Sequence, residues 1–326
     1  MTEKILEVKD LKTYFFTRHG VVKAVDGVSF WVGEGETLGI VGESGSGKSI
    51  TCLSILRLVP QPAGRIINGQ IILAGENLMS KSEREMRRIR GKRISMILQD
   101  PMTSLNPVFT VGYQVGVPIT LHQRVDKKVV GAKVQEMLRK VRIPSPEVRM
   151  GEYPHQMSGG MRQRIVGAMA LSCQPQLLIA DEPTTALDVT IQAQFLRLLK
   201  EIQQSSKLSM IVVTHDFGIV ARVCDRVAVM YAGKMVECAP IRNLFSTPLH
   251  PYTVALLDSL PKMDKKVKKL YAIEGQPPDL ANLPAGCSFA SRCSQAMEIC
   301  RKEFPPQSFV RDGHTVSCWL TDSGRT

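Results

Sequence analysis

Hydrophobic residues occur along the chain in two kinds of run, and the way these runs alternate predicts a sheet covered by helices. Short apolar runs of strand length lie at residues 37–41, 94–98, 177–180 and 210–213. Longer segments carry apolar residues three or four positions apart, as in Ile191, Phe195, Leu198 and Ile202. Fully apolar strands that alternate with amphipathic helices are typical of a mostly parallel sheet with both faces buried. We therefore predict an α/β fold.

Three parts of the chain depart from this pattern. Residues 5–40 contain short apolar or alternating runs between polar turns, which predicts short strands. Residues 102–160 carry short apolar helices broken by Pro and Gly, which predicts a helical subdomain inserted into the core. After about residue 240 proline becomes frequent and cysteines cluster. We expect one domain over residues 1–240 and a Cys-rich C-terminal extension over 241–326.

Composition narrows the class of protein. The chain has 326 residues, of which 44% are hydrophobic, a fraction typical of a globular protein. No stretch approaches about 18 uncharged apolar residues, so we expect no membrane-spanning helix. The first ten residues carry charges where a secretory signal would be apolar, so we expect no secretion. The eight cysteines are then expected to be thiols or metal ligands.

The net charge of +12 does not identify a partner by itself. Nucleic acid, an anionic membrane face and polyanionic ligands such as nucleotides all attract a basic protein. The segment Lys81–Arg93 holds seven basic and two acidic residues. Such runs are usually a solvated helix face, and we interpret this one so.

The segment Gly42–Ser49, with the sequence GESGSGKS, follows one apolar run and precedes an apolar segment of helical length. This strand–loop–helix context is the one in which G-x-x-x-x-G-K-S binds phosphates. Gly42, Gly45 and Gly47 allow a tight turn, which with Ser44 directs backbone N–H groups at phosphate oxygens. Lys48 is expected to reach the β and γ phosphates, and Ser49 to bind Mg²⁺. The segment predicts that the chain binds the phosphates of a nucleotide.

Two further elements suit phosphate chemistry. Asp181 and Glu182 follow an apolar strand, where Asp181 can hold the Mg²⁺ shell and Glu182 can polarise the attacking water. Ser158, Gly159 and Gly160 precede an apolar helix and can bind a second phosphate at its N-terminus, although Ser158 can equally be a plain helix cap. The γ phosphate of one nucleotide can use both phosphate sites only if the chain folds back or a second subunit supplies one of them.

Six elements in one order resemble the ATP-binding subunit of ABC transporters over residues 5–240. They are the Walker A motif Gly42–Ser49, the Q-loop residue Gln99, the signature Met157–Met161, the Walker B motif Leu177–Glu182, the D-loop Ala186–Asp188 and the switch histidine His215. The signature departs from the family pattern at Met157, where Leu is usual, and at Met161, where Gln is usual. Its Ser-Gly-Gly is intact.

The resemblance implies a P-loop NTPase core of the RecA-like type, with an antiparallel β subdomain, and a head-to-tail dimer. The phosphate loop of one subunit would bind ATP, and Ser158, Gly159 and Gly160 of the other would close over it. Glu182 would activate water, and His215 would stabilise charge on the γ phosphate. Gln99 would touch Mg²⁺ or the water and sense the helical insertion. Phe15 stands where the family usually has the aromatic ring that stacks on adenine.

The C-terminal segment narrows the resemblance. Leu249-His-Pro-Tyr-Thr253 and the Cys-rich region that begins at Pro284-Ala-Gly-Cys287 are similar to the oligopeptide/dipeptide branch of importers. This implies an ATPase at the cytoplasmic face of the membrane that powers import of di- and oligopeptides. Its partners would be two transmembrane permease subunits, a paralogous second ATPase subunit and, indirectly, an extracytoplasmic peptide-binding protein, with no nucleic acid.

Two other functions remain open. Soluble ABC-type ATPases that act on nucleic acid or ribosomes would explain the positive charge, but they usually have duplicated cassettes or long coiled-coil insertions. ATPases of nickel importers are close relatives, but they typically lack a Cys-rich extension.

Four cysteines fall within 32 residues, at Cys287, Cys293, Cys300 and Cys318. Structural zinc usually shows closely spaced C-x₂₋₄-C pairs, and none occurs here. Four thiolates in a loop suit a [4Fe–4S] cluster, to which the resemblance also points. Zinc and reduced structural thiols are the alternatives, and His314 is a possible substitute ligand. We interpret Cys52, Cys173, Cys224 and Cys238 as small buried hydrophobic residues.

Overall fold

The structure is a computed structural model that describes residues 3–99, 101–184, 188–260, 272–311 and 313–321. The chain forms two compact units, and each is built from separate segments. The first unit comprises Met1–Glu7, Trp31–Thr37 and Ile72–Val213. The second unit comprises Val8–Phe30, Leu38–Ile71 and Thr214–Thr326.

The N-terminal strands are longer than the sequence predicted. β1 (Lys4–Thr17) and β2 (Gly20–Gly33) each have 14 residues, and a two-residue connection joins them. So short a connection joins antiparallel neighbours, as the predicted β subdomain requires. The expected short strands were wrong because exposed polar residues alternate with buried ones along both strands without ending them. β4 (Gly64–Leu73) is the neighbour of β1 on its other side.

A second sheet of the second unit includes the strand that leads into the phosphate loop. β3 (Thr37–Val41) is parallel to β9 (Arg226–Tyr231), with Ile40 opposite Ala228. β9 is antiparallel to β10 (Lys234–Pro240), and β10 is antiparallel to β12 (His314–Val316). β11 (Ser308–Arg311) lies at the edge of this sheet, beside β12. The C-terminal extension therefore adds two strands to the sheet that carries the phosphate loop.

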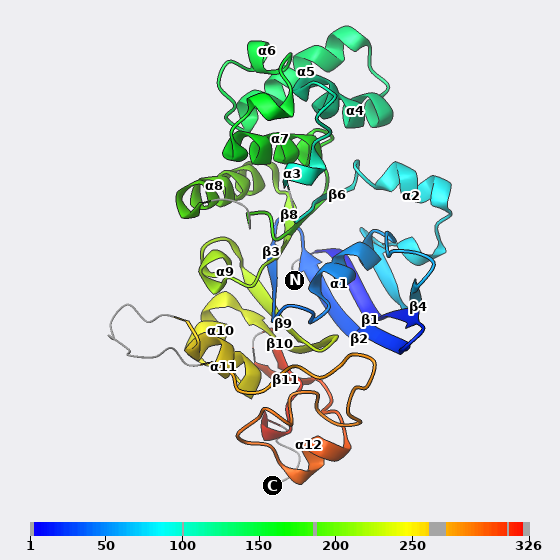
Figure 1. Ribbon diagram of the computed structural model, residues 1–326, viewed down its shortest axis with the longest axis vertical. Helices are drawn as coiled ribbons and strands as arrows, with labels where there is room; N and C mark the ends of the chain where they lie inside the picture. Colours follow the sequence, from blue (N-terminus) through cyan, green and yellow to red (C-terminus); the bar gives the residue numbers. More distant parts are fainter. Residues whose placement is uncertain (1–2, 100, 185–187, 261–271, 312, 322–326) are drawn as a thin grey trace. The chain divides into compact units, whose positions relative to one another are not determined.

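The helices of the second unit are short (Figure 1). They are α1 (Lys48–Ile55), α9 (Phe217–Val223), α10 (Ile241–Ser246), α11 (Pro251–Asp258) and α12 (Glu298–Lys302). The short turn η3 (Trp319–Thr321) lies near the end of the described chain.

Three parallel strands form the sheet of the first unit. β6 (Ile94–Ile97) pairs with β7 (Leu177–Asp181), and β7 pairs with β8 (Ser209–Val213). Every residue of β7 and β8 is buried, as the continuous apolar runs predict.

Most helices of the first unit pack against one another (Figure 1). They are α3 (Pro101–Ser104), α4 (Val111–Gln123), α5 (Lys127–Lys140), α6 (Pro146–Arg149), α7 (Gly159–Leu171) and α8 (Val189–Ser206). The buried face of α5 includes Val134, Met137 and Leu138, and Val141 follows it. These apolar residues, which lie three or four positions apart, pack into the helical core of the unit.

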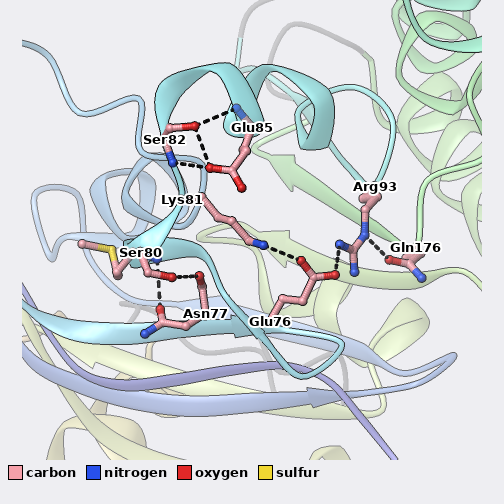
Figure 2. A network of polar contacts seen from close by, with 9 residues as sticks. Glu76, Asn77, Ser80, Lys81, Ser82, Glu85, Arg93 and Gln176 are labelled. Carbon is pink, nitrogen blue, oxygen red and sulfur yellow. Dashed lines mark hydrogen bonds and ion pairs between the residues drawn. The ribbon is translucent and has the colours of Figure 1, made fainter.

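The basic run Lys81–Arg93 forms the surface helix α2 (Glu83–Ile89) and its flanks. Ser82 and Glu85 begin the helix with a capping box (Figure 2). Lys81 and Arg93 both contact the carboxylate of Glu76 on β5 (Glu76–Asn77), at 2.9 and 2.8 Å. These two cations hold the pKa of Glu76 below its usual range. This arrangement agrees with the interpretation of the run as a solvated helix face.

A short 3₁₀ turn, η1 (Leu78–Ser80), connects β5 to this helix, and another, η2 (Pro154–Gln156), precedes α7. Over the residues that the structure describes, no helix combines the length and the apolarity needed to cross a bilayer.

Candidate functional site

The loop Gly42–Ser49 leaves β3 and enters α1, as the sequence predicts. Lys48 is buried, and its Nζ donates to the carbonyl oxygens of Gly42 and Glu43, each at 2.8 Å. Ser44 and Gly45 are exposed at the tip of the loop, and Ser49 is half-buried in the first turn of α1. The loop is thus folded around its own lysine, with an exposed tip at a helix N-terminus that suits an anion.

Two glycines of this loop are required by close backbone contacts. A Cβ on Gly42 would lie 2.1 Å from the carbonyl oxygen of Met230, and one on Gly47 would lie 2.2 Å from that of Ala24. Gly42, Gly45 and Gly47 all have positive φ, at 154°, 77° and 103°. The tight turn that the sequence predicted is therefore present in the structure.

His215 lies at the same end of the sheet as the phosphate loop. The N–H of Thr214 donates to the carbonyl oxygen of Ile40 at 3.2 Å, one residue before Val41 ends β3. His215 follows Thr214 and is exposed. An exposed imidazole near this edge is suited to contact a phosphate that the loop binds. The position of His215 is therefore compatible with its expected role, which stays a prediction.

Phe15 is half-buried, and its ring lies against Gly64, the first residue of β4. A Cβ on Gly64 would lie 2.8 Å from its ring atom Cε1. The neighbouring rings have other contacts: the hydroxyl of Tyr14 donates to Asp26 at 2.6 Å, and Arg65 lies 5.5 Å above the ring of Phe16. The stacking of Phe15 on adenine stays a prediction.

In the first unit, two of the predicted hydrolytic side chains meet. The Nε2 of Gln99 donates to Oε2 of Glu182 at 2.8 Å. The contact arises because β6 and β7 are parallel neighbours: Gln99 comes two residues after β6, and Glu182 comes directly after β7. Asp181, the last residue of β7, is buried. The parallel register thus collects an amide and two carboxyl groups at one edge of the sheet.

Glu182 has a left-handed backbone, with φ of 43°. This conformation is uncommon for a residue other than glycine and occurs often at functional positions. The N–H of Glu182 donates to the carbonyl oxygen of Val213 at 2.9 Å, which holds the residue at the end of β8.

The signature segment begins helix α7. Ser158 is its N-cap, and its Oγ accepts the N–H of Met161 at 3.3 Å. Ser158 and Gly159 are exposed, whereas Met157 is buried in the helical core. Methionine therefore fills the position where the family usually has leucine as an apolar core residue. The serine is a helix cap and is also accessible to a phosphate, so both interpretations remain compatible with the structure.

Sequence reasoning missed Gln163 on α7. This side chain is fully buried, and its Nε2 donates to the carbonyl oxygen of Pro183. It thereby connects the signature helix to the residue that follows Glu182.

Of the predicted D-loop, Ala186 and Leu187 lie outside the described residues. Asp188 is the N-cap of α8 and accepts the N–H of Ile191 at 3.0 Å.

Two side chains that follow the predicted domain boundary contact the phosphate loop, and sequence reasoning missed both. Arg292 forms an ion pair with Glu43, and the hydroxyl of Tyr252 accepts the N–H of Glu43. Tyr252 belongs to the segment Leu249–Thr253 that marked the importer branch. Nothing in the pattern around Arg292, which precedes Cys293, indicated its partner.

The four clustered cysteines line one small cavity of the second unit. Burial raises the pKa of Cys287 and Cys293, and raises that of Cys318 to about 11, with a further rise from the neighbouring sulfurs. Backbone N–H groups donate to three of these sulfurs from Phe289, Ala290, Gln295 and Leu320. Over the described part of the chain, no group of three or more His, Cys, Asp or Glu side chains is placed to hold a metal ion. The predicted cluster stays a prediction.

The other cysteines mostly fit the structural interpretation. Cys52, Cys224 and Cys238 are buried, whereas Cys173 is only half-buried.

His314 does not face the cysteine cavity. Its Nε2 is 2.7 Å from Oε1 of Glu237, and both side chains are fully buried. The possible substitution of His314 for a cysteine ligand therefore has no support in its position.

His250 is a buried side chain that couples stability to pH. Its Nδ1 accepts the N–H of Tyr252 at 3.0 Å at the start of α11. Burial lowers the pKa of His250 to about 4, since the imidazolium would lose its hydration. The unfolded chain therefore takes up this proton first as the pH falls. The associated stability is present above about pH 6.5 and is lost progressively down to about pH 4.

We expect the free energy of unfolding to fall by about 2 kcal/mol between pH 7 and pH 5 because of His250. His250→Asn keeps a capping acceptor but removes the titration, so this part of the pH dependence should disappear. Chemical denaturation at both pH values measures the effect. His155→Asn, at an exposed position, is the matched control and should keep the wild-type dependence. An unchanged pH dependence in His250→Asn would contradict the assignment.

Comparisons with known proteins cover nearly the whole chain. A family model described as "ABC transporter" matches residues 25–185, and one described as "Oligopeptide/dipeptide transporter, C-terminal region" matches residues 236–300. The chain is 53% identical to the dipeptide transport ATP-binding protein DppD of Bacillus subtilis, over 98% of this chain and 96% of the relative. It is 51% identical to the oligopeptide transport ATP-binding protein OppD of the same organism, over 97% of this chain and 89% of the relative.

Solved structures extend these matches to the fold. The chain resembles the ATP-binding cassette MJ0796, solved as a dimer bound to ADP and phosphate, with a TM-score of 0.65 and 25% identity. The match covers 73% of this chain and 99% of the cassette. The structure of cbiO1 from Clostridium perfringens matches with the same TM-score over 75% of this chain and 92% of that structure. The predicted fold class, an α/β P-loop NTPase, is confirmed.

Proposed function

Because the chain belongs to the ATP-binding proteins of ABC transporters, in the oligopeptide/dipeptide branch, we propose that it hydrolyses ATP to power the import of di- and oligopeptides. The observation that carries this proposal is the match to DppD over 98% of the chain, which includes the C-terminal region. The relatives described above are peptide-transport proteins. This favours peptide import over the nickel and nucleic-acid alternatives.

The phosphate loop supplies most of the binding energy for ATP in this proposal. Gly42, Gly45 and Gly47 with Ser44 direct backbone N–H groups at the phosphates, and Lys48 exchanges its contacts with loop carbonyls for phosphate oxygens. Phe15 would stack on the adenine. Ser49, Gln99 and Asp181 would hold Mg²⁺, which supplies positive charge that neutralises the phosphates when bound.

Hydrolysis then depends on charge and orientation. Glu182 accepts a proton from the attacking water, and Gln99 holds the carboxylate of Glu182 by the bond that the structure contains. His215 stabilises the charge that develops on the transferred phosphoryl group. Ser158, Gly159 and Gly160 of a partner subunit would complete the site, which requires a head-to-tail dimer. The exposure of Ser158 and Gly159 supports this role.

The proposed assembly contains two permease subunits, a paralogous second ATPase subunit and an extracytoplasmic peptide-binding protein. The ATPase would lie at the cytoplasmic face of the membrane. Residues 1–240 would form the ATPase domain, with the helical subdomain at about 102–160 contacting the permease. Residues 241–326 would form the C-terminal extension, and the family match at 236–300 supports this division.

We also propose a [4Fe–4S] cluster on Cys287, Cys293, Cys300 and Cys318, with zinc as the alternative. Two observations favour it: all four cysteines line one cavity, and backbone N–H groups donate to the sulfurs of three of them. Hydrogen bonds to cysteine sulfur are a common feature of iron–sulfur sites. When bound, the cluster would cross-link four separate points of the extension.

Lys48→Ala tests the transport function. The substitution removes the one cation buried within the loop, and charge-assisted hydrogen bonds are worth about 1.5–3 kcal/mol each. In a host strain that lacks the wild-type protein, we expect the variant to reduce uptake of a radiolabelled dipeptide to background. The exposed substitution Arg87→Ala on α2 should leave uptake unchanged.

Affinity purification of the same chain from host membranes should recover two permease subunits and an ATPase paralogue. Dipeptide uptake that is equal in the Lys48→Ala and wild-type strains would contradict peptide import powered by this chain. Recovery of ribosomal proteins or DNA in place of permease subunits would favour the nucleic-acid alternative.

A further inference from the structure

Glu43 is the second residue of the phosphate loop, and the C-terminal extension holds its carboxylate. Nη1 of Arg292 lies 2.8 Å from Oε2 of Glu43, and Nη2 lies 3.0 Å from Oε1. The side chain of Arg292 is 4% exposed, and that of Glu43 is 25% exposed. This is a two-pronged, largely desolvated ion pair between residues that are 249 positions apart.

Arg292 is held in place by further contacts. Its guanidinium donates to the hydroxyl of Tyr231 at 3.1 Å and to the carbonyl oxygen of Glu274 at 3.0 Å. It also lies 5.8 Å from the centres of the Tyr231 and Phe289 rings, within cation–π range. Because the guanidinium of Arg292 is planar and fixed on several sides, it can keep both hydrogen bonds only while the carboxylate stays in one position. The pair therefore restricts the position of Glu43.

Tyr252 holds the backbone of the same residue. Its hydroxyl accepts the N–H of Glu43 at 2.9 Å, and the tyrosine is fully buried. The ring of Tyr252 packs against Tyr231 and Phe289, at centroid distances of 4.5 and 5.3 Å. Since Lys48 donates to the carbonyl oxygen of Glu43, the amide, the carbonyl and the carboxylate of Glu43 all have partners.

The negative charge of Glu43 affects how strongly the loop can bind a phosphate ligand. A carboxylate on the second residue of a phosphate-binding loop repels a polyphosphate unless a cation compensates it. Arg292 supplies that cation from the extension. Tyr252 meanwhile fixes the peptide group from which the rest of the loop turns, so the loop is arranged before the ligand arrives.

We propose that Arg292 and Tyr252 are positioning residues for ATP binding, through which the C-terminal extension neutralises Glu43 and fixes the start of the phosphate loop. The inference rests on the proposed function, because it assumes that the loop binds ATP. It assigns the extension a direct part in nucleotide affinity, whatever the four cysteines bind.

A charge-removal series on the full-length chain tests the role of Arg292. Arg292→Ala is expected to raise the Kd for ATP, measured by calorimetry with Mg²⁺, by about tenfold, which corresponds to about 1.4 kcal/mol. Added salt should reduce the loss, because it screens the uncompensated carboxylate. The double variant Arg292→Ala/Glu43→Gln should recover to within about twofold of Glu43→Gln alone, since the repelling charge is gone.

Tyr252→Phe tests the second contact with little change of packing. It removes only the hydroxyl that accepts the Glu43 N–H, and we expect Kd to rise about threefold because one hydrogen bond is lost. Lys302→Ala is the matched control, because it breaks an exposed ion pair with Glu298 within the extension. It should leave ATP affinity unchanged, and thermal unfolding of every variant shows whether the chain has folded.

The outcomes separate this inference from the proposed function. If the wild-type chain binds ATP and Lys48→Ala does not, but the Arg292 and Tyr252 variants bind like wild type, the inference is wrong and the function stands. If the double variant binds as weakly as Arg292→Ala, charge compensation is wrong and the arginine is merely structural. If the folded wild-type chain fails to bind ATP, the proposed function itself fails.

Discussion

Glu182→Gln is expected to reduce ATP turnover by about 10²- to 10⁴-fold, the range in which a positioned general base contributes to catalysis. Glutamine has nearly the same shape as glutamate, and its amide oxygen can still accept the hydrogen bond from Gln99 that the structure contains at 2.8 Å. The variant therefore keeps the local geometry and loses only the group that accepts a proton from water. Release of phosphate under saturating ATP measures the change.

Binding should survive in the same variant. None of the phosphate-loop residues is altered, so ATP is bound but not consumed, and the ATP-driven dimer should accumulate. Size-exclusion chromatography with and without ATP would detect it. Glu201→Gln is the matched control, because Glu201 is a carboxylate on the surface of α8 that pairs with Arg142 at 2.5 Å. Turnover retained in Glu182→Gln would remove Glu182 from its proposed role.

Loss of iron and sulfide from a single cysteine variant is the second large effect that we expect. Protein purified without oxygen should contain about four iron and four sulfide per chain, as a [4Fe–4S] cluster requires. Cys300→Ser replaces a buried thiol of the cavity with a weak ligand and should lower both contents strongly. Metal analysis, sulfide assay and the visible absorption spectrum measure the change together.

Cys173→Ser is the control for this experiment, because Cys173 is half-buried and does not line the cavity. It should keep the iron content of the wild type. Thiolate ligands must lose their protons, and burial raises the pKa of three of these thiols, so bound metal should be lost as the solution becomes acidic. Stoichiometric zinc without iron in the wild-type protein would reject the cluster in favour of the alternative.

The fold was predictable from the sequence where a local pattern of apolar residues directly specifies a buried strand or helix. Continuous apolar runs at 177–180 and 210–213 predicted buried parallel strands, and both are fully buried. The pattern failed for β1 and β2, since exposed polar residues in a long strand resemble turn residues when the chain is read by itself. It also gave no sign that β11 and β12 join the sheet of β10, because strands of three or four residues carry too little periodicity.

The residues of the candidate site could likewise be predicted from the sequence only in part. The glycines at positions 42 and 47 could be assigned from sequence because they precede a lysine at fixed spacing, and the structure shows backbone contacts that exclude a Cβ. The contact between Gln99 and Glu182 was not predicted, because apolar runs do not show which strands are neighbours; it arises since β6 and β7 are parallel and end at one edge of the sheet. Gln163 could not be found, since its partner is a backbone carbonyl that any residue offers.

The sequence by itself determined the chemistry that consecutive residues specify: a phosphate loop, an acidic pair after a strand, a capped helix and four spaced thiols. Each depends on backbone conformations and side-chain types within a few positions, so local rules suffice. Only the tertiary structure decided that Arg292 and Tyr252 contact Glu43 and that four cysteines line one cavity. Ion pairs and cavities form between residues that are distant in sequence, and the packing of the folded chain alone selects such partners.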